Sequence, residues 1–233
     1  MIPIPDPPII LARHTTETGE IQLQHRLLPD GSDAFEIISD GVFLMSSQFH
    51  EGERVLAQQA LTTIMNHPQS ARSVLVGGLG MGFTLQETLN HAVNKVDLIE
   101  ISGHVIDWNQ QYFTQLNNHG LTDTRTNLIQ QDLYSVLTQT KPATYAAIIL
   151  DVDNGPSWLA HTQNNRLYTD EALTSWAESL VPSGIFAVWS AQPEPEFMAR
   201  MTHHFHDVEE ITVPVPDHKN RPRMDYIYRG VCG

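Results

Sequence analysis

A glycine-rich turn follows an apolar run in the first third of the chain. Val74-Leu-Val leads into Gly77 and Gly78, and the spacing continues as Gly78-x-Gly80-x-Gly82 before a helical pattern begins. Glycine lets the backbone turn sharply and approach a ligand closely, and free N–H groups at the start of the helix can then bind that ligand. A dinucleotide site would require Gly-x-Gly-x-x-Gly and a phosphate-binding loop would require Gly-Lys-Ser/Thr, and neither pattern is present. The observed spacing is typical of sites for S-adenosylmethionine.

Two carboxylates lie where an adenosyl ligand would need them. Glu100 ends the next predicted strand, about 20 residues beyond the glycines, and can accept hydrogen bonds from both ribose hydroxyls. Asp132 follows the third predicted strand, where it can accept a hydrogen bond from the adenine amino group. Each acid alone could be a solvated strand end or a helix N-cap. The order and spacing of these features together favour an adenosyl site, to which we also assign the neighbouring Ile101 and Leu133.

An acidic turn follows the fourth predicted strand. It contains Asp151, Asp153 and Asn154 and runs into a Gly-Pro pair. Ligands of parallel sheets bind at the carboxyl ends of the strands, so this turn is expected to face the reactive end of the ligand. Two carboxylates and an amide could hold an amine nucleophile and accept its proton, with Asp151 toward the donor and Asp153 toward the acceptor. The alternative is a turn that Asp and Asn stabilise by bonding their own backbone.

Strands and helices alternate along the chain from residue 73 and would place these features at one edge of a sheet. Repeated strand–helix units imply a parallel sheet covered by helices on both faces. A β-hairpin at the end adds two strands, the last of them inserted antiparallel. The expected fold is therefore α/β, a doubly wound, seven-stranded Rossmann-like arrangement of the methyltransferase type. The predicted strands are 73–76, 95–99, 127–130, 145–150, 184–189, 207–215 and 224–231, and the predicted helices are 84–91, 103–116, 133–138, 168–180 and 194–204.

A small β unit precedes this alternation. Residues 1–8 are rich in proline and are expected to form an extended arm, because proline cannot donate to a strand ladder. Alternating apolar and polar residues over 20–27, 35–38 and 42–45 predict strands, with a turn at Asp40-Gly41. A helical period follows over 53–66 and ends before Pro68. We expect two domains, an N-terminal part of residues 1–66 and an adenosyl-ligand-binding domain of residues 67–233.

The charge balance limits the classes of ligand that the chain is expected to bind. The 233 residues include 13 Lys and Arg against 27 Asp and Glu, a formal net charge of −14. This argues against a duplex nucleic-acid partner, which needs a basic face, and is compatible with a cationic substrate.

No apolar run is long enough to span a membrane and no secretory signal is recognised, so a cytoplasmic location is expected. The single cysteine, Cys232, excludes a disulfide framework, and His203, His204 and His206 lack the spacing of a metal site, so no metal is expected.

Several short motifs resemble those of the spermidine synthase, or polyamine aminopropyltransferase, family. They are His67-Pro68, the apolar run into Gly77-Gly78, Leu98-Ile-Glu100, Gln131-Asp132, Ile149-Leu-Asp151 and Leu167-Tyr168-Thr169, and the resemblance covers about residues 20–190. The family is part of the class I S-adenosylmethionine-dependent methyltransferase superfamily. The resemblance implies transfer of an aminopropyl group from decarboxylated S-adenosylmethionine to an amine, with methylthioadenosine as product, and a homodimer.

The resemblance also implies roles for individual residues. Glu100 would bind ribose, Asp132 would lie on the adenine side, and the turn at Asp151 would bind the amine and the aminopropyl donor. The residues that would contact the amine substrate are His50, Glu51, Asn154 and Tyr168.

The sequence departs from the family pattern at several positions. Gly80 stands where the family has an acidic residue, Asp153-Asn154 replaces a second Asp three residues after the first, and Leu44 replaces a glutamine. Two alternatives therefore remain open. The chain could transfer a methyl group, or react otherwise at the sulfonium, with a different small molecule and yield S-adenosylhomocysteine. It could also bind an adenosyl ligand without catalysis.

Overall fold

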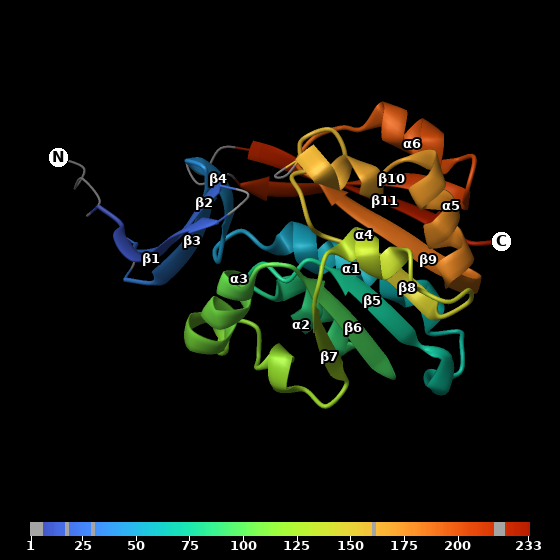
Figure 1. Ribbon diagram of the computed structural model, residues 1–233, viewed down its shortest axis with the longest axis horizontal. Helices are drawn as coiled ribbons and strands as arrows, with labels where there is room; N and C mark the ends of the chain where they lie inside the picture. Colours follow the sequence, from blue (N-terminus) through green and yellow to red (C-terminus); the bar gives the residue numbers. More distant parts are fainter. Residues whose placement is uncertain (1–6, 17–18, 29–30, 160–161, 217–221) are drawn as a thin grey trace. The chain divides into compact units, whose positions relative to one another are not determined.

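The computed structural model describes residues 7–16, 19–28, 31–159, 162–216 and 222–233 (Figure 1). Contacts divide the chain into two compact units, Met1–His50 and Glu51–Gly233, and each unit has its own β-sheet. The boundary lies earlier than the expected division at residues 66 and 67. Helix α1 (Glu51–Ile64) belongs to the larger unit, because its side chains Leu56, Leu61 and Ile64 are fully buried and it packs against strands β8 (Tyr145–Leu150) and β9 (Leu180–Ser190).

The smaller unit is a four-stranded antiparallel sheet with its strands in chain order. The strands are β1 (Ile9–Thr16), β2 (Gly19–Leu27), β3 (Asp33–Ser39) and β4 (Val42–Ser46). The turn between β3 and β4 is the predicted Asp40-Gly41 pair, both with positive φ, as a tight hairpin requires. Strand β1 was not predicted, because as an edge strand it is largely exposed and lacks a regular apolar alternation. Most of the expected arm, residues 1–6, lies outside the described residues.

The larger unit contains the predicted seven-stranded sheet, in the order β10-β11-β9-β8-β5-β6-β7. Strands β5 (Ser73–Gly77), β6 (Lys95–Glu100), β7 (Thr126–Gln130), β8 and β9 are parallel. The last strand, β11 (Pro222–Val231), is inserted antiparallel between β9 and β10 (His206–Pro216). The sequence prediction of this topology is confirmed. The carboxyl ends of β5, β6, β7 and β8 consequently meet at one edge, where the predicted site residues follow them.

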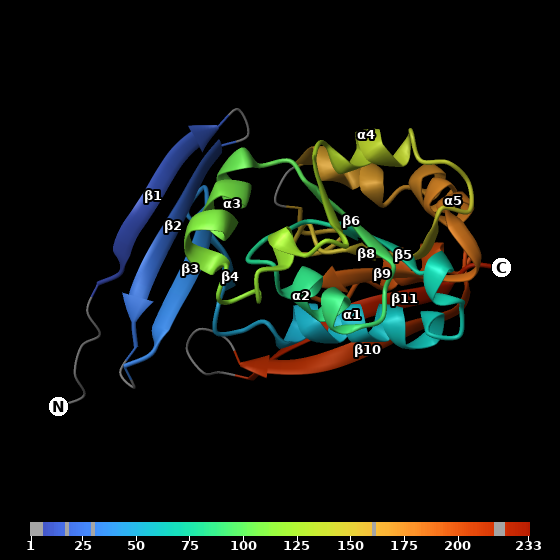
Figure 2. The same ribbon diagram turned by 90° about the horizontal axis from the view of Figure 1, so that it is seen from below.

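Helices cover both faces of the sheet (Figure 2). On one face, α1 packs against α2 (Phe83–Asn90). On the other face lie α4 (Leu133–Leu137) and α5 (Asp170–Ser179). Apolar side chains of these helices and of α6 (Pro195–Met201) share one core cluster. That cluster includes Leu75 and Ile148 from the sheet and Trp176 from α5, all fully buried. The two buried faces explain why the central strands are apolar without alternation.

One predicted helix is shorter than expected. Helix α3 covers Gly103–Trp108 and continues as a π-helical turn over Asn109–Phe113, whereas the sequence pattern predicts a helix over residues 103–116. Two buried amides on this irregular segment hold the glycine-rich turn. Asn109 Nδ2 donates to the carbonyl of Gly80 at 2.7 Å, and Asn117 Nδ2 donates to the carbonyl of Met81 at 3.1 Å. The segment therefore departs from a regular helix where it satisfies carbonyls of the turn.

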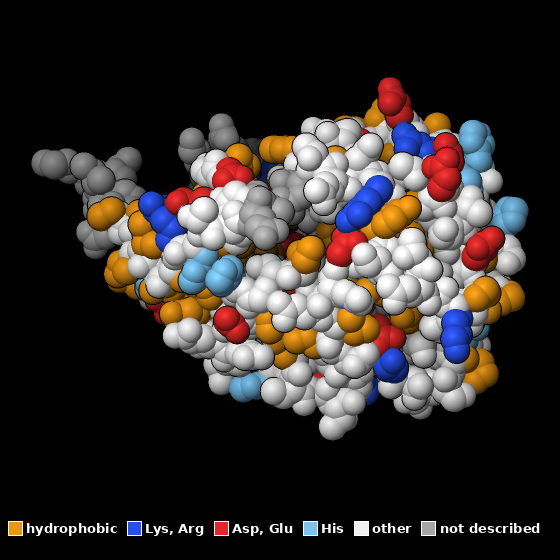
Figure 3. All heavy atoms as spheres, in the orientation of Figure 1, with side chains coloured by type: hydrophobic (Ala, Val, Ile, Leu, Met, Phe, Trp, Pro, Cys, Tyr) orange, Lys and Arg blue, Asp and Glu red, His pale blue; other side chains and the backbone are white. Residues whose placement is uncertain are grey.

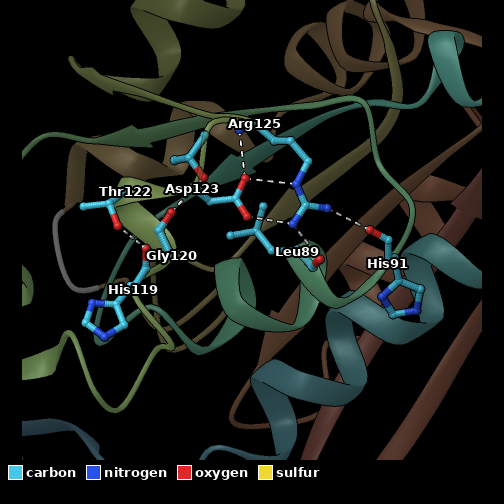
Figure 4. Close-up of polar contacts among 8 residues, drawn as sticks. Leu89, His91, His119, Gly120, Thr122, Asp123 and Arg125 are labelled. Carbon is cyan, nitrogen blue, oxygen red and sulfur yellow. Dashed lines mark hydrogen bonds and ion pairs between the residues drawn. The ribbon is translucent and has the colours of Figure 1, made fainter.

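A second polar cluster fixes the far end of α2. The Arg125 guanidinium donates to the Asp123 carboxylate and to the carbonyls of Leu89 and His91 (Figure 4). Its hydrogen bonds hold the pKa of Asp123 below the usual value. The cluster ties the end of α2 to the start of β7, which helps to fix the helix that follows the glycine-rich turn.

Candidate functional site

The glycine-rich turn between β5 and α2 requires glycine at specific positions. Gly78, Gly80 and Gly82 have φ values of +93°, +50° and +87°, a region that favours glycine. A Cβ on Gly78 would lie 2.0 Å from the backbone oxygen of Asp151. A Cβ on Gly77 would lie 2.7 Å from a methyl group of Leu133. The turn therefore lies against Asp151, which follows β8, and against the start of α4, which follows β7.

Glu100 joins the end of β6 to this turn. Its carboxylate accepts hydrogen bonds from the backbone N–H groups of Leu79 at 3.0 Å and Ser102 at 2.7 Å. Burial raises the pKa of Glu100, and the hydrogen bonds from Ser102 and Leu79 act in the opposite direction. Ile101 beside it is exposed, with 61% of its surface accessible. The structure places both residues next to the turn, and their contact with a ribose stays a prediction.

Asp132 is the N-cap of α4, the alternative that the sequence left open. Its carboxylate accepts hydrogen bonds from the backbone N–H and the hydroxyl of Ser135. The other oxygen lies 2.6 Å from a guanidinium nitrogen of Arg166, which comes from the segment after β8. Arg166 in turn lies over the Tyr134 ring, 4.8 Å from its centroid. The cap does not exclude a further hydrogen bond, and the adenine role of Asp132 stays a prediction.

Asp151 lies at the centre of the site. Its backbone N–H donates to the carbonyl of Gly77, and its carboxylate accepts a hydrogen bond from the Thr84 hydroxyl at 2.6 Å. Thr84 is in the first turn of α2, directly after the glycine-rich turn. Burial raises the pKa of Asp151 to about 6, the Thr84 hydrogen bond opposes that rise, and the negative charge of Asp225 adds to it. A carboxyl with such a pKa can exchange a proton near neutral pH.

Asp153 is buried and is held by two side chains from the following segment. Asn164 Nδ2 donates to one carboxylate oxygen at 3.1 Å, and the Tyr168 hydroxyl donates to the other at 3.2 Å. Burial and the negative charge of Asp153 raise the pKa of Tyr168, so the phenol stays a donor. Asn154 is also buried, and its carbonyl accepts a hydrogen bond from the backbone N–H of Ala191. Three of the predicted site residues therefore come together here.

Two further predicted substrate residues, His50 and Glu51, have contacts with near neighbours in the sequence. His50 belongs to the smaller unit, and its ring lies 3.1 Å from the carbonyl of Ser47. The Glu51 carboxylate forms an ion pair with Arg54, and nearly half of its side chain is exposed. Their contact with a substrate stays a prediction.

Sequence reasoning missed two acids near Asp151. Glu53, two residues after the predicted site residue Glu51, is buried in α1, and Asp225 is buried in β11. Asp225 accepts a hydrogen bond from the Trp189 indole at 3.2 Å and forms an ion pair with Arg223 at 2.8 Å. A signal for Glu53 existed, because it lies three and four residues before Leu56 and Ala57 and so shares the apolar face of the helix. No local pattern distinguishes Asp225 from an exposed strand residue.

Figure 3 shows Lys and Arg side chains scattered singly over the face that it draws, between acidic and hydrophobic side chains. None of the helices in the described part of the chain is long and apolar enough to cross a membrane.

Comparison with known proteins identifies the family. The sequence model of the spermine/spermidine synthase domain matches residues 39–220. The chain belongs to the spermine/spermidine synthase family. A polyamine aminopropyltransferase of Prochlorococcus marinus (strain MIT 9215) is 26% identical over 163 residues, which cover 68% of this chain and 53% of that protein. Spermidine synthase 1 of Pisum sativum is 28% identical over 182 residues, which cover 76% of this chain and 48% of that protein.

Solved structures of this family share the fold. The spermidine synthase of Thermotoga maritima superposes with a TM-score of 0.73 at 20% identity, over 96% of this chain and 73% of that one. A spermidine synthase in complex with the transition-state analogue AdoDATO gives a TM-score of 0.74 at 21% identity, over 96% of this chain and 74% of that one. The chain spans about half the length of the curated relatives it matches.

Proposed function

We propose that this protein transfers an aminopropyl group from decarboxylated S-adenosylmethionine to an amine acceptor. The observation that carries the proposal is the pair Asp151 and Asp153 at the end of β8, directly against the glycine-rich turn. The Asp151 backbone lies against Gly78, and the Asp153 carboxylate accepts hydrogen bonds from Asn164 and Tyr168. Family membership supports the same reaction, because the matched relatives are named as aminopropyltransferases.

The donor would bind along the edge of the sheet formed by β5, β6 and β7. A Cβ on Gly78 or Gly82 would collide with Asp151 or Asn117, so the turn keeps its backbone bare, and the donor would approach that backbone closely. Glu100 would accept hydrogen bonds from ribose and Asp132 one from adenine. The sulfonium carries a positive charge, which Asp151 would offset.

The reaction requires the acidic turn to bind an amine and to accept a proton from it. The lone pair of a neutral amine nitrogen attacks the propyl carbon next to the sulfonium, and the C–S bond breaks. Its electron pair stays on sulfur, giving neutral methylthioadenosine, and the new ammonium then releases a proton. Alkylamines are mostly protonated at neutral pH, with a pKa of about 10.4 for a lysine-like group. A carboxylate that binds the amine and accepts its proton meets both needs, and we assign this role to Asp153, with Asp151 toward the donor.

Further parts of the proposal concern metal, assembly and location. The sulfonium is itself a good leaving group, so the transfer needs no metal ion, and a chelator should leave the rate unchanged. We also propose a homodimer in the cytoplasm. Sedimentation of the purified protein tests the assembly, and localisation of a tagged chain tests the compartment.

The experiment for the reaction compares two donors. The protein is incubated with decarboxylated S-adenosylmethionine or with S-adenosylmethionine, each with a pool of amines, and the products are identified by mass spectrometry. The proposal predicts methylthioadenosine from the first donor. S-adenosylhomocysteine from the second would indicate methyl transfer instead, and neither product would indicate an adenosyl-binding protein without catalysis.

A further inference from the structure

A cavity of about 750 Å³ lies at the edge of the seven-stranded sheet opposite the candidate site. It is lined by Asn66, which precedes β5, by Ser183 near the start of β9, and by Val231 at the end of the antiparallel β11. These positions are at the amino ends of the parallel strands, whereas Asp151 and the glycine-rich turn follow carboxyl ends. The volume is in the range of small-molecule sites. The cavity is therefore separate from the positions of donor and acceptor in the proposed reaction.

Arg229 is a largely buried cation that lines this cavity, with 12% of its side chain exposed. Its Nε donates to the carbonyl of Gln59 at 3.1 Å and a terminal nitrogen donates to the Thr63 hydroxyl at 2.7 Å, so the guanidinium is fixed against α1. The other terminal nitrogen lies 3.5 Å from a carboxylate oxygen of Glu209, longer than a normal hydrogen bond.

The Arg229 guanidinium has donors left for a ligand. Within the described residues, its contacts use three of the five N–H groups of a guanidinium, which leaves two. Guanidinium N–H groups bind carboxylates through charge-assisted hydrogen bonds, and a side chain that is already fixed loses little freedom when it does so. The cavity can therefore bind a carboxylate at Arg229.

An exposed acid lines the same cavity from a β-bulge. The register of β10 against β11 shifts between His206 and Glu209, and Asp207 within this bulge has a φ of +47°. Bulges redirect side chains and are frequent beside binding sites. Ser183, which also lines the cavity, has a φ of +62°. Left-handed backbone at residues other than glycine is unfavourable and is retained more often where a ligand binds.

The remaining lining residues indicate the kind of ligand. Val208 and Val231 are partly buried and give the cavity an apolar part. The titratable side chains that line it are His67, Asp207, Glu209 and Arg229. The formal net charge of the whole chain is −14, which disfavours a simple anion. A ligand that carries both charges and an aliphatic chain matches this lining.

We propose that this cavity is a second binding site, which takes a small zwitterion with an aliphatic chain, such as an aliphatic α-amino acid. Arg229 binds the carboxylate, Asp207 binds the ammonium group, and the aliphatic chain lies against the two valines. Glu209 competes with the carboxylate of the ligand for Arg229. The inference goes beyond the proposed function, because this ligand is neither the donor nor the acceptor of the reaction.

Calorimetry with three matched probes tests the site in the absence of any donor. L-norleucine carries both charges and the aliphatic chain, 1-aminopentane lacks the carboxylate, and hexanoate lacks the ammonium group. We expect norleucine to bind, and each partial probe to bind about 10- to 100-fold more weakly, because it loses charge-assisted hydrogen bonds.

Variants assign the two charged contacts. Asp207→Asn keeps a residue that tolerates positive φ, and it should weaken norleucine binding about tenfold and change hexanoate affinity less than about twofold. Glu209→Gln releases the Arg229 guanidinium, so both carboxylates should bind about 2- to 10-fold more tightly. Arg229→Lys keeps the charge but not the planar donors, and should weaken both about tenfold. The control Glu178→Gln removes an exposed negative charge on α5 and should match the parent protein.

Four outcomes would overturn the proposal. They are no binding of norleucine, equal affinities for norleucine and 1-aminopentane, unchanged norleucine affinity in both Asp207→Asn and Glu209→Gln, and loss of norleucine binding in Asp153→Asn, which would place the ligand at the acidic turn. Asp207 and Glu209 are exposed, so their variants should fold even if Arg229→Lys, which alters contacts with α1, does not. Methylthioadenosine formation is measured without these probes, so failure of the reaction and failure of this site are distinguishable.

Discussion

At the scale of single residues, Asp151 is the group on which the site's chemistry depends. It contacts Gly77 and Gly78 through its backbone and Thr84 through its carboxylate. Its pKa of about 6 results from burial, opposed by the Thr84 hydrogen bond. Activity that requires the ionised carboxylate should therefore fall as the pH is lowered through about 6.

The variant Thr84→Val tests this assignment. It removes the hydrogen bond that stabilises the charged form, so the pKa of Asp151 should rise and the acid limb of the pH–rate profile should move to higher pH. The matched control is Thr88→Val, one turn further along α2, where the hydroxyl bonds only the Thr84 carbonyl in the described structure. An acid limb that stays in place in Thr84→Val would show that Asp151 is not the titrating group.

The residue scale also shows how far the sequence could predict the site. Asp151 and Asp153 were identifiable because they directly follow an apolar strand in a fold whose ligands bind at strand ends. Glu53 and Asp225 were not, because their proximity to Asp151 depends on how α1 and β11 pack in three dimensions. Asp132 was identified, and its cap of α4 was among the alternatives, but its ion pair with Arg166 joins residues 34 positions apart.

At the scale of elements, the turn from β5 to α2 lies against the residue that follows β8 and against the α3 region. Gly78 lies against the Asp151 carbonyl, and Asn109 and Asn117 hold the neighbouring carbonyls. This explains why the α3 region is irregular where the sequence predicted a continuous helix. The apolar period continues past Trp108, but local pattern does not reveal that buried amides further along bond to another loop.

The variant Gly78→Ala should disrupt this junction. Its Cβ would lie 2.0 Å from a backbone oxygen at a φ of +93°, so the backbone has to move, and we expect a loss of about 3 kcal/mol or more in unfolding free energy. Urea unfolding measures the loss. The control is Gly41→Ala, where φ is also positive but no atom lies within 4 Å of the added Cβ. There we expect only the strain of about 1 kcal/mol. Equal effects of the two substitutions would contradict the close approach.

At the scale of the whole molecule, buried acids make stability depend on pH. Glu53, Asp151 and Asp225 have raised pKa values in the folded state, so the folded protein binds more protons than the unfolded chain between about pH 4 and the raised values. Stability should therefore rise as the pH falls from 7.5 toward 5.5. Asp123 and Asp170 have lowered pKa values and act oppositely, but only below that window.

The variant Glu53→Gln tests this dependence. It removes one buried charge, so it should raise the unfolding free energy at pH 7.5 by on the order of 1 kcal/mol and flatten the slope between pH 7.5 and 5.5. Urea unfolding at a series of pH values gives both quantities, with Glu178→Gln as the exposed control. A slope identical to that of the parent protein would show that Glu53 ionises normally.

The topology of the larger unit was predictable because strongly apolar strands alternate with helices, and chain connectivity then restricts the sheet order. The boundary between the two units was harder to predict from the sequence. Helix α1 precedes the first parallel strand in sequence, and only its packing against β8 and β9 shows that it belongs to the larger unit. The comparisons place the chain in the spermine/spermidine synthase family.

The most direct test of the account is the rate of methylthioadenosine formation by Asp153→Asn. Asparagine keeps the size of the side chain, its Oδ1 can still accept the hydrogen bond from Asn164 and its Nδ2 can donate to the Tyr168 oxygen, but it cannot accept a proton. We predict a rate about 10²–10⁴-fold below that of the parent protein, the range for removal of a general base, with donor affinity by calorimetry nearly unchanged. A rate equal to that of the parent protein would contradict the account and show that Asp153 only shapes the turn.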